Sequence, residues 1–204
     1  MSGLFVNKLF IYGVLIGILT SCGSTRDTTS QIYAGSPLTP KVVLSPPPTV
    51  YQLRLDYRGE ETMGVQYYRD QARARYRVWI CGALLCDQRG VLLDPQLGNP
   101  AHAKRSGKAI FVIDPEARLW VTFDQRYGVT HHSSLVAGGP VVAAGEMVVA
   151  RGQVISVSNE SGHYHPDPDS VLVTLEVLRQ MGADISRVER YVMRSGQQKA
   201  RRQR

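Results

Sequence analysis

Paired apolar runs joined by short turn signals constrain the fold of this chain more than any other feature. Residues 109–113 (AIFVI) and 119–123 (LWVTF) flank a turn that contains Asp114 and Pro115, and residues 147–150 and 153–157 flank Arg151-Gly152. Apolar runs of this length, separated by so few residues, are typical of β-hairpins. A third hairpin is predicted where 84–85 and 91–93 flank the turn 87–90. The sequence therefore predicts a largely antiparallel sheet built of hairpins.

One amphipathic helix follows the hairpins. Asp167 or Asp169 can cap its first turn, Pro168 suits that turn, and Gly182 suits the position after its end. Apolar residues at helical spacing form one stripe: Val171, Leu175, Leu178 and Met181. Residues 187–193 then alternate, as in a final strand, and 51–57 alternate in the same way before the hairpins. The predicted fold class is α+β, with one C-terminal helix and a last strand.

The first 22 residues have the layout of a bacterial lipoprotein signal. Lys8 precedes the uncharged apolar run 9–18, and Leu19-Thr20-Ser21-Cys22 matches a lipobox. An apolar run this short is typical of a cleaved secretory signal and not of a permanent span. Only the thiol of Cys22 can carry the diacylglyceryl thioether, with palmitate among the acyl chains. The alternatives are an ordinary signal peptide or an uncleaved anchor, in either of which Cys22 is incidental.

The composition divides the rest of the chain. Residues 22–51 are rich in Ser, Thr and Pro and predict an extended tether, 52–195 predict one globular domain, and 196–204 form a basic tail. With 1–21 as the signal peptide, this arrangement predicts a lipoprotein of the bacterial outer membrane, on its periplasmic face, because Gly23 and Ser24 follow Cys22 and no Asp holds the second position.

The net charge of +7 favours a negatively charged partner. For an envelope protein this means an anionic lipid or an envelope protein, in addition to the membrane contact through the lipid. No nucleic-acid-binding motif is present, so nucleic acid is not expected. Arg73, Arg75 and Arg77 fall on one face of a predicted strand, and we favour a solvated face over an anion site.

Cys81 and Cys86 form an even pair once Cys22 is assigned to the lipid. They flank four residues that can turn a hairpin, and disulfides persist in oxidising compartments. We predict a Cys81–Cys86 disulfide, with two buried free thiols as the alternative. Neither spacing nor number favours a metal role for these cysteines.

Four of the five histidines fall between residues 130 and 166. Because imidazole titrates near neutrality and binds metals, this cluster is compatible with a metal site, a nucleophilic site or a binding site. A metal site would use His163 and His165 with Asp167 or His131. A nucleophilic site would use Ser133 or Ser134, activated by His132 or His163 and oriented by Glu146.

A binding site is the third possibility, because glycines allow close approach of a ligand or a strand. Its predicted residues are Gly138, Gly139, Gly145, Ser161, Gly162 and Tyr164. We favour a fourth, purely structural interpretation, in which Gly and Ala permit tight strand packing. In that interpretation Glu146 is a satisfied buried acid, and His163 and Tyr164 bond the free amides at the start of the helix. No metal and no cofactor are predicted.

The block His-Ser-Ser-Leu-Val-Ala-Gly-Gly-Pro-Val-Val-Ala-Ala-Gly-Glu (132–146), a hairpin, and Ser-Gly-His-Tyr-His-Pro (161–166) resemble a known domain. It occurs in bacterial proteins of unknown function, some of them similar to C-terminal modules of secreted polymorphic toxins, and in plant IQ-motif calmodulin-binding proteins. The likeness runs from about residue 77 to 192. Matching positions are His132, Ser133, Ser134, Gly138, Gly139, Ala144, Gly145, Glu146, Ser161, Gly162, His163, Tyr164 and Pro166.

The resemblance implies a domain type without a settled reaction. No IQ helix is found in the sequence, so calmodulin binding is not implied. The expected function is a lipid-anchored envelope lipoprotein with a periplasmic binding or interaction domain. The alternative is a toxin-like hydrolase or transferase that uses His132, Ser133, Glu146 and His163, so the question of an enzyme stays open.

Overall fold

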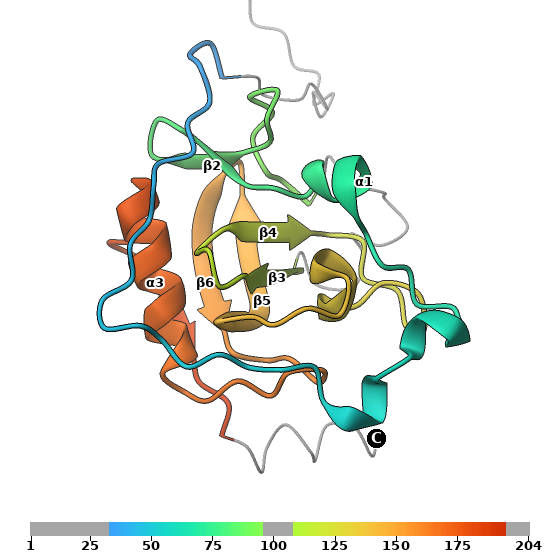
Figure 1. Ribbon diagram of the computed structural model, residues 1–204. Coiled ribbons are helices and arrows are strands. Elements are labelled where there is room, and N and C mark those ends of the chain that lie inside the picture. Colours follow the sequence, from blue (N-terminus) through green and yellow to red (C-terminus); the bar gives the residue numbers. More distant parts are fainter. Residues whose placement is uncertain (1–32, 96–107, 195–204) are drawn as a thin grey trace, which may run out of the picture.

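A computed structural model describes residues 33–95 and 108–194 (Figure 1). The elements in chain order are η1 (Leu55–Tyr57), η2 (Glu60–Met63), α1 (Asp70–Ala74), β1 (Trp79–Cys81), β2 (Leu84–Cys86), β3 (Lys108–Ile113), β4 (Leu119–Thr122), η3 (His132–Val136), β5 (Ala143–Ala150), β6 (Gln153–Ser158), α3 (Ser170–Met181) and β7 (Glu189–Tyr191).

The centre of the molecule is a five-stranded sheet in the order β4-β3-β5-β6-β7. Neighbouring strands are antiparallel except β6 and β7, which are parallel. Both predicted central hairpins, β3–β4 and β5–β6, are present. Together with the helix α3, this confirms the α+β fold class and the largely antiparallel sheet.

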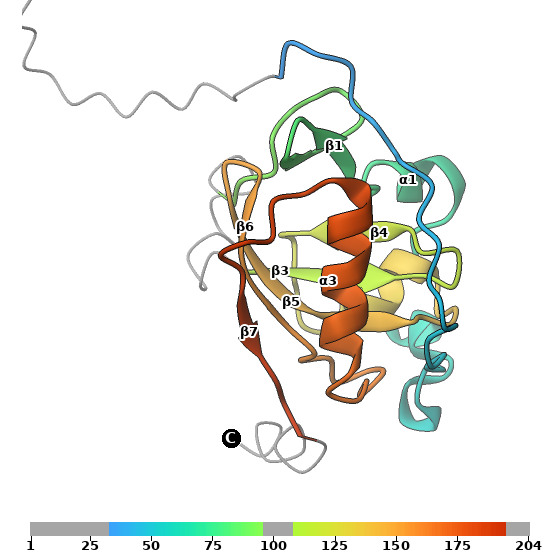
Figure 2. The same ribbon diagram turned by 90° about the vertical axis from the view of Figure 1, so that its left-hand side faces the viewer.

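Helix α3 covers one face of the sheet (Figure 2). Its buried residues Val171, Val177 and Leu178 join Phe111 and Met147 in the larger apolar core. Asp167 starts the helix, because its Oδ1 accepts the backbone N–H groups of Asp169 and Ser170 at 3.0 and 3.3 Å. Gly182 ends it with φ of +95°, a left-handed conformation that glycine adopts without a steric penalty.

The opposite face of the sheet is only partly covered. Ile110, Val112 and Trp120 point to this side and pack against Leu135 of η3 and Tyr164. Among the described residues, the covering layer thus consists of η3, the loop before α3 and the segments that contribute Leu53 and Tyr68, and not of a second long helix. The other half of this face, towards β6 and β7, holds the pocket described below.

The outer edge of β4 is not open. The backbone N–H of Val78 donates to Leu119 O at 3.0 Å, and that of Val121 donates to Tyr76 O at 2.9 Å. Residues 76–78 therefore pair with β4. The stretch 74–80, whose alternation predicts a single strand, is divided: it begins with the end of α1 and a turn, makes this pairing and ends in β1.

Strands β1 and β2 form a separate small hairpin that carries the Cys81–Cys86 disulfide, which confirms the predicted pair. The register pairs Cys81 with Leu84, so the turn consists of Gly82 and Ala83 only. The two cysteines therefore lie diagonally across the hairpin, and not opposite each other as a four-residue connection would place them.

Residues 33–51 run along the domain in extended form. Leu38 pairs with Ile80, Tyr51 pairs with Val141, and the backbone N–H of Val43 donates to the side chain of Gln180. The described part of the predicted tether is thus hydrogen-bonded to the domain. The strand predicted at 51–57 is absent, since this segment makes one bridge and then enters η1.

The predicted signal peptide, Cys22 and the basic tail lie outside the described residues. Within the described ranges, no helix is long and apolar enough to cross a membrane.

Gly145 is the position where β5 tolerates no side chain. A Cβ atom there would lie 1.8 Å from Ser158 O and 3.1 Å from the ring of Phe111. The first of these neighbours is backbone and cannot rotate away. Gly162, from the same block of residues, has nothing within 4 Å of a built Cβ.

We expect Gly145→Ala to lower the free energy of unfolding by about 3 kcal/mol or more, the upper part of the range for overpacked cores. Urea denaturation measures this difference. Gly162→Ala is the matched control and should change the free energy of unfolding by less than about 0.5 kcal/mol. Equal effects of the two substitutions would contradict the close β5–β6 approach.

Candidate functional site

The short helix η3 contains three of the candidate site residues, His132, Ser133 and Ser134. His131 precedes it, and the His131 backbone N–H donates to Ser134 Oγ at 3.0 Å. The Tyr68 backbone N–H donates to Ser134 O at 2.9 Å, which fixes η3 to the segment before α1. The helix ends at Ala137 and Gly138, both with positive φ. Glycine is required at position 138 for two reasons: its φ is positive, and a Cβ atom there would lie 2.9 Å from the ring of Tyr67.

His132 points from η3 into the sheet. Its Nε2 donates to Gly145 O at 2.9 Å, and the residue is 5% exposed. Burial lowers the pKa of His132 to about 4, although the bond to the Gly145 carbonyl favours the charged form. The imidazole is therefore neutral at pH 7 and acts as a buried hydrogen-bond donor.

His163 meets a carboxylate that the sequence analysis did not identify. Its Nε2 lies 3.0 Å from Glu60 Oε2, and Tyr67 Oη donates to Glu60 Oε1 at 3.2 Å. Burial raises the pKa of Glu60, and the neighbouring hydroxyls of Ser133 and Tyr67 oppose that rise. We call Glu60, Tyr67, Ser133, His131 and His163 the Glu60 cluster.

The imidazole of His163 lies within a stack of rings. The Tyr57 ring lies 4.0 Å from it and the His131 ring 4.5 Å, centroid to centroid. His131 Nε2 accepts a hydrogen bond from the Gly128 N–H at 3.0 Å. Protonation of that nitrogen would remove the acceptor and place two N–H groups face to face. Burial lowers the pKa of both His131 and His163, and their mutual repulsion lowers that of His163 further.

Glu60 lies 103 residues from His163 in the chain, within a polar stretch that has no periodic pattern. The flanking Gly59 and Gly64, both with positive φ, are the one local signal that this segment turns sharply. Nothing in the sequence indicates that the carboxylate is buried.

Glu146 lies apart from this cluster. Its carboxylate bonds Lys108 Nζ at 2.9 Å, and its backbone contacts the Ser158 hydroxyl. The structure therefore brings His163 and Ser133 together around Glu60, turns His132 towards β5, and places Glu146 at the open half of the sheet face.

The residues around the second part of the block stabilise the loop before α3. Tyr164 Oη donates to Gly139 O at 2.7 Å, and Ser161 O accepts the His165 N–H. The expectation that His163 and Tyr164 bond the first amides of the helix is therefore wrong. Asp167 has that role, and the two rings instead reach back to η2 and to the end of η3.

No group of three His, Cys, Asp or Glu side chains within the described ranges is placed to hold a metal ion. His165 Nδ1 lies 2.7 Å from the Arg54 guanidinium, whereas His163 bonds Glu60. His163 and His165, which the sequence suggests as a pair of metal ligands, thus bond different partners.

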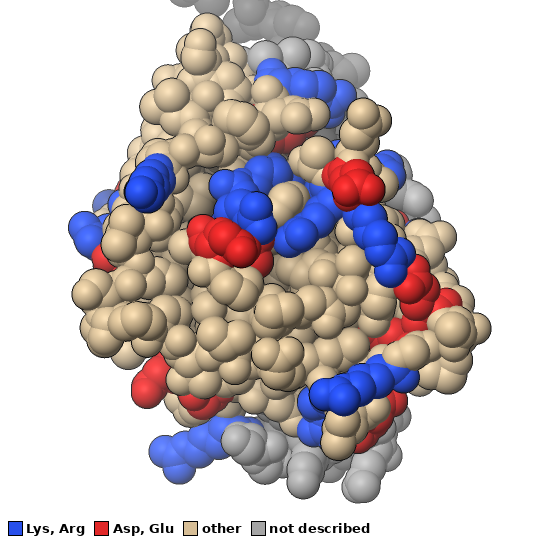
Figure 3. Space-filling view, in the orientation of Figure 1, with Lys and Arg blue, Asp and Glu red and all other residues tan. Residues whose placement is uncertain are grey.

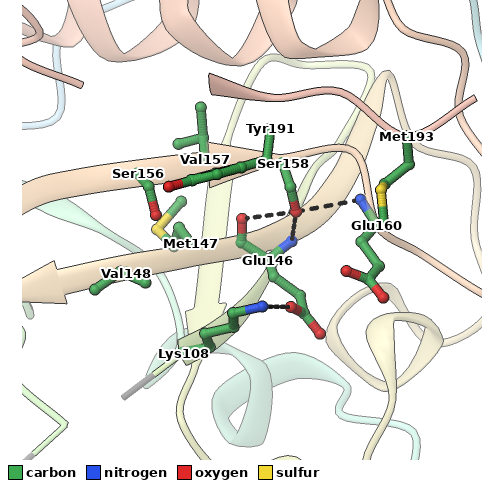
Figure 4. Close-up of a pocket in the computed structure, with 10 residues that line it drawn as sticks. All are labelled: Lys108, Glu146, Met147, Val148, Ser156, Val157, Ser158, Glu160, Tyr191 and Met193. Carbon is green, nitrogen blue, oxygen red and sulfur yellow. Dashed lines mark hydrogen bonds and ion pairs between the residues drawn. The ribbon is translucent and has the colours of Figure 1, made fainter. Parts of the chain in front are cut away.

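The uncovered half of the sheet face forms a cavity of about 370 Å³, which we call the open-face pocket (Figure 4). It extends over β5, β6 and β7, and both polar and apolar side chains line it. Its lining residues are Lys108, Glu146, Met147, Val148, Ser156, Val157, Ser158, Glu160, Tyr191 and Met193.

Comparison with known proteins finds similarity to plant proteins. Residues 73–171 match the family described as IQ motif-containing protein middle domain. IQ domain-containing protein IQM3 of Arabidopsis thaliana is 32% identical over 126 residues, which are 61% of this chain and 26% of that protein. IQM2 and IQM1 of the same plant are 39% and 27% identical, over 40% and 62% of this chain and 13% and 24% of those proteins. No solved structure matches the chain.

This chain spans about a quarter or less of the length of these relatives. The similarity supports the resemblance to IQ-motif proteins. It contradicts the predicted function as a lipid-anchored bacterial envelope lipoprotein, and the alternative of a toxin-like hydrolase or transferase. The outer-membrane location and the envelope or anionic-lipid partners are contradicted as well, because the matched relatives are plant IQ domain-containing proteins. A lipobox is a pattern of four residues, and 126 aligned residues outweigh it.

The buried histidines predict a loss of stability in acid. The pKa of His132 is about 4 in the folded chain and near 6.5 unfolded, so below pH 6.5 only the unfolded chain gains this proton. We expect this residue alone to lower the free energy of unfolding by about 2 kcal/mol between pH 7 and pH 5. Urea denaturation at both pH values measures the loss.

His132→Gln is the matched variant, because its amide can still donate to Gly145 O and does not titrate. The loss between pH 7 and pH 5 should be smaller in this variant, although His131 and His163 still contribute. An unchanged loss would contradict the assignment of His132 as a buried neutral donor.

Proposed function

We propose that this chain is a protein-interaction module that holds a short peptide segment of a partner in the open-face pocket. The observation that carries the proposal is the pocket itself. Its volume of about 370 Å³ lies in the range of specific binding sites, and it occupies the half of the sheet face that η3 leaves uncovered.

The walls of the pocket suit a peptide. Val148, Tyr191 and Met193 offer apolar surface for one or two side chains. The Lys108–Glu146 ion pair at the rim is 40% and 17% exposed, so both groups are able to bond peptide amides and carbonyls. A mixed lining of this kind favours an apolar anchor side chain with polar main chain on either side.

The Glu60 cluster supports a different role. Glu60 and His163 are each less than 9% exposed and bonded to each other, Ser133 is buried beside Glu60, and His132 is bonded to the sheet. We propose that these residues, with Gly138, Gly139 and Tyr164, hold η3 against β5. The partner is then recognised on the surface and not at the histidines.

The similarity to a middle domain agrees with this proposal. In the relatives, the matched region is a part of a longer protein that is named for a separate IQ domain. A domain in that position joins other parts of a chain, and an interaction role for it fits such an arrangement.

Selection from a random peptide library displayed on phage tests the proposal. We expect the wild-type chain to select peptides with a shared apolar anchor. Val148→Trp fills the pocket and should weaken the selected peptides about tenfold or more, measured by fluorescence anisotropy.

Leu172→Trp is the matched control, since residue 172 lies on the exposed side of α3, on the other face of the sheet. It should leave peptide affinity unchanged. If Val148→Trp fails to fold, Lys108→Ala tests the same pocket from its rim. Failure to select any peptide, or equal affinity in the pocket and control variants, would refute the proposal.

A further inference from the structure

A cluster of arginines around Trp120 holds more positive charge than its carboxylates balance. Figure 3 shows basic side chains gathered over the region of β4 and α1, beside a small acidic patch. The guanidinium carbons of Arg73, Arg77 and Arg118 lie 4.0, 5.4 and 5.8 Å from the centroid of the Trp120 ring.

A buried carboxylate organises this cluster. Asp114 Oδ2 accepts Arg118 Nε at 2.7 Å, Trp120 Nε1 at 2.9 Å and Arg73 Nη2 at 3.2 Å, and its side chain is 3% exposed. Glu116 Oε2 accepts a further hydrogen bond from Arg118 Nη2 at 2.7 Å. These contacts fix the indole and two guanidiniums in one place.

Arg77 has no ion pair or side-chain hydrogen bond within the part of the chain that the structure describes. Its buried Nε lacks a partner, and so does the buried Nε of Arg73. The ionised groups facing Arg73 and Arg77 are Asp114, Glu116 and Arg118, which leaves an excess of one positive charge. Burial lowers the pKa of both arginines, although guanidinium stays charged at pH 7.

We propose that Arg73, Arg77 and Arg118 form a binding site for a phosphate group, with Trp120 as its floor. The planar carboxylate of Asp114 accepts one hydrogen bond from Arg73 and one from Arg118, and the other N–H groups of Arg73 do not bond it. The remaining donors belong to separate arginines, so they suit an anion that accepts from several directions. A phosphomonoester carries three acceptor oxygens, one for each guanidinium, and a charge of about −1.5 to −2 at pH 7, which more than neutralises the excess of one positive charge.

The phosphate group has two possible sources, a free phosphate and a phosphorylated side chain of another protein. The site lies over β4, at the opposite end of the sheet from the open-face pocket over β5–β7. This inference is therefore independent of the proposed peptide binding, and either can fail without the other.

Nuclear magnetic resonance titration at constant ionic strength tests the site directly. The indole N–H signal of Trp120 reports on the cluster, and that of Trp79 serves as an internal reference. We expect inorganic phosphate, or a phosphoserine peptide, to shift the Trp120 signal to saturation. Tighter binding of the phosphoserine peptide than of inorganic phosphate identifies a phosphorylated protein as the source, and the reverse order identifies free phosphate.

Arg77→Gln should weaken this binding about tenfold or more, the usual effect of losing a charged hydrogen bond. Arg75→Gln is the matched control, because Arg75 packs over Tyr76 and bonds Ala72 O. It should leave the affinity within about twofold. If Arg77→Gln does not fold, Arg77→Lys keeps the charge without the planar fork and should also bind more weakly. No saturable shift in the wild type, or equal affinities for the Arg77 and Arg75 variants, would overturn the proposal.

Discussion

The contact of η3 with β5 at Gly145 is the constraint on which the rest of the structure depends. Because residue 145 has no side chain, the Ser158 backbone packs closely against it, and the Gly145 carbonyl remains available to the His132 imidazole. One glycine thus sets the spacing of two strands and the position of the helix that covers them. A larger residue would disturb the sheet and the covering layer together.

The Glu60 cluster extends this constraint to parts of the chain that are distant in sequence. Glu60 precedes the sheet, Ser133 lies in η3 and His163 lies in the loop before α3. A buried hydrogen bond joins Glu60 to His163, and the Ser133 hydroxyl lies beside the Glu60 carboxylate. Buried polar groups specify a unique arrangement when their partners are in place, and they cost stability when one partner is removed. Residues that have the chemistry of a catalytic site lie here in the interior between η2, η3 and the loop before α3, where they join distant parts of the fold.

The sequence predicted what depends on local pattern. The β3–β4 and β5–β6 hairpins and helix α3 follow from apolar spacing and turn residues, and the disulfide follows from the count and spacing of Cys81 and Cys86. It did not predict Glu60 as the partner of His163, because a contact across 103 residues leaves no periodic signal. Alternation at 51–57 and 74–80 suggested one strand each. The first segment makes a single bridge, and the second is divided between the end of α1, a turn and β1, while Tyr57 and Tyr76 pack against the covered face of the sheet. The lipobox failed for another reason, since a pattern of four residues carries little information about function.

Pairing of residues 76–78 with β4 leaves the three-residue strand β7 as the open edge of the sheet among the described residues. An exposed strand edge is a template on which a second molecule can add its own strand, and long apolar edges lead to aggregation. Here the open edge is short and includes Glu189 and Arg190, so an incoming strand would meet charged side chains after few hydrogen bonds. A short, charged edge of this kind opposes the growth of extended sheets.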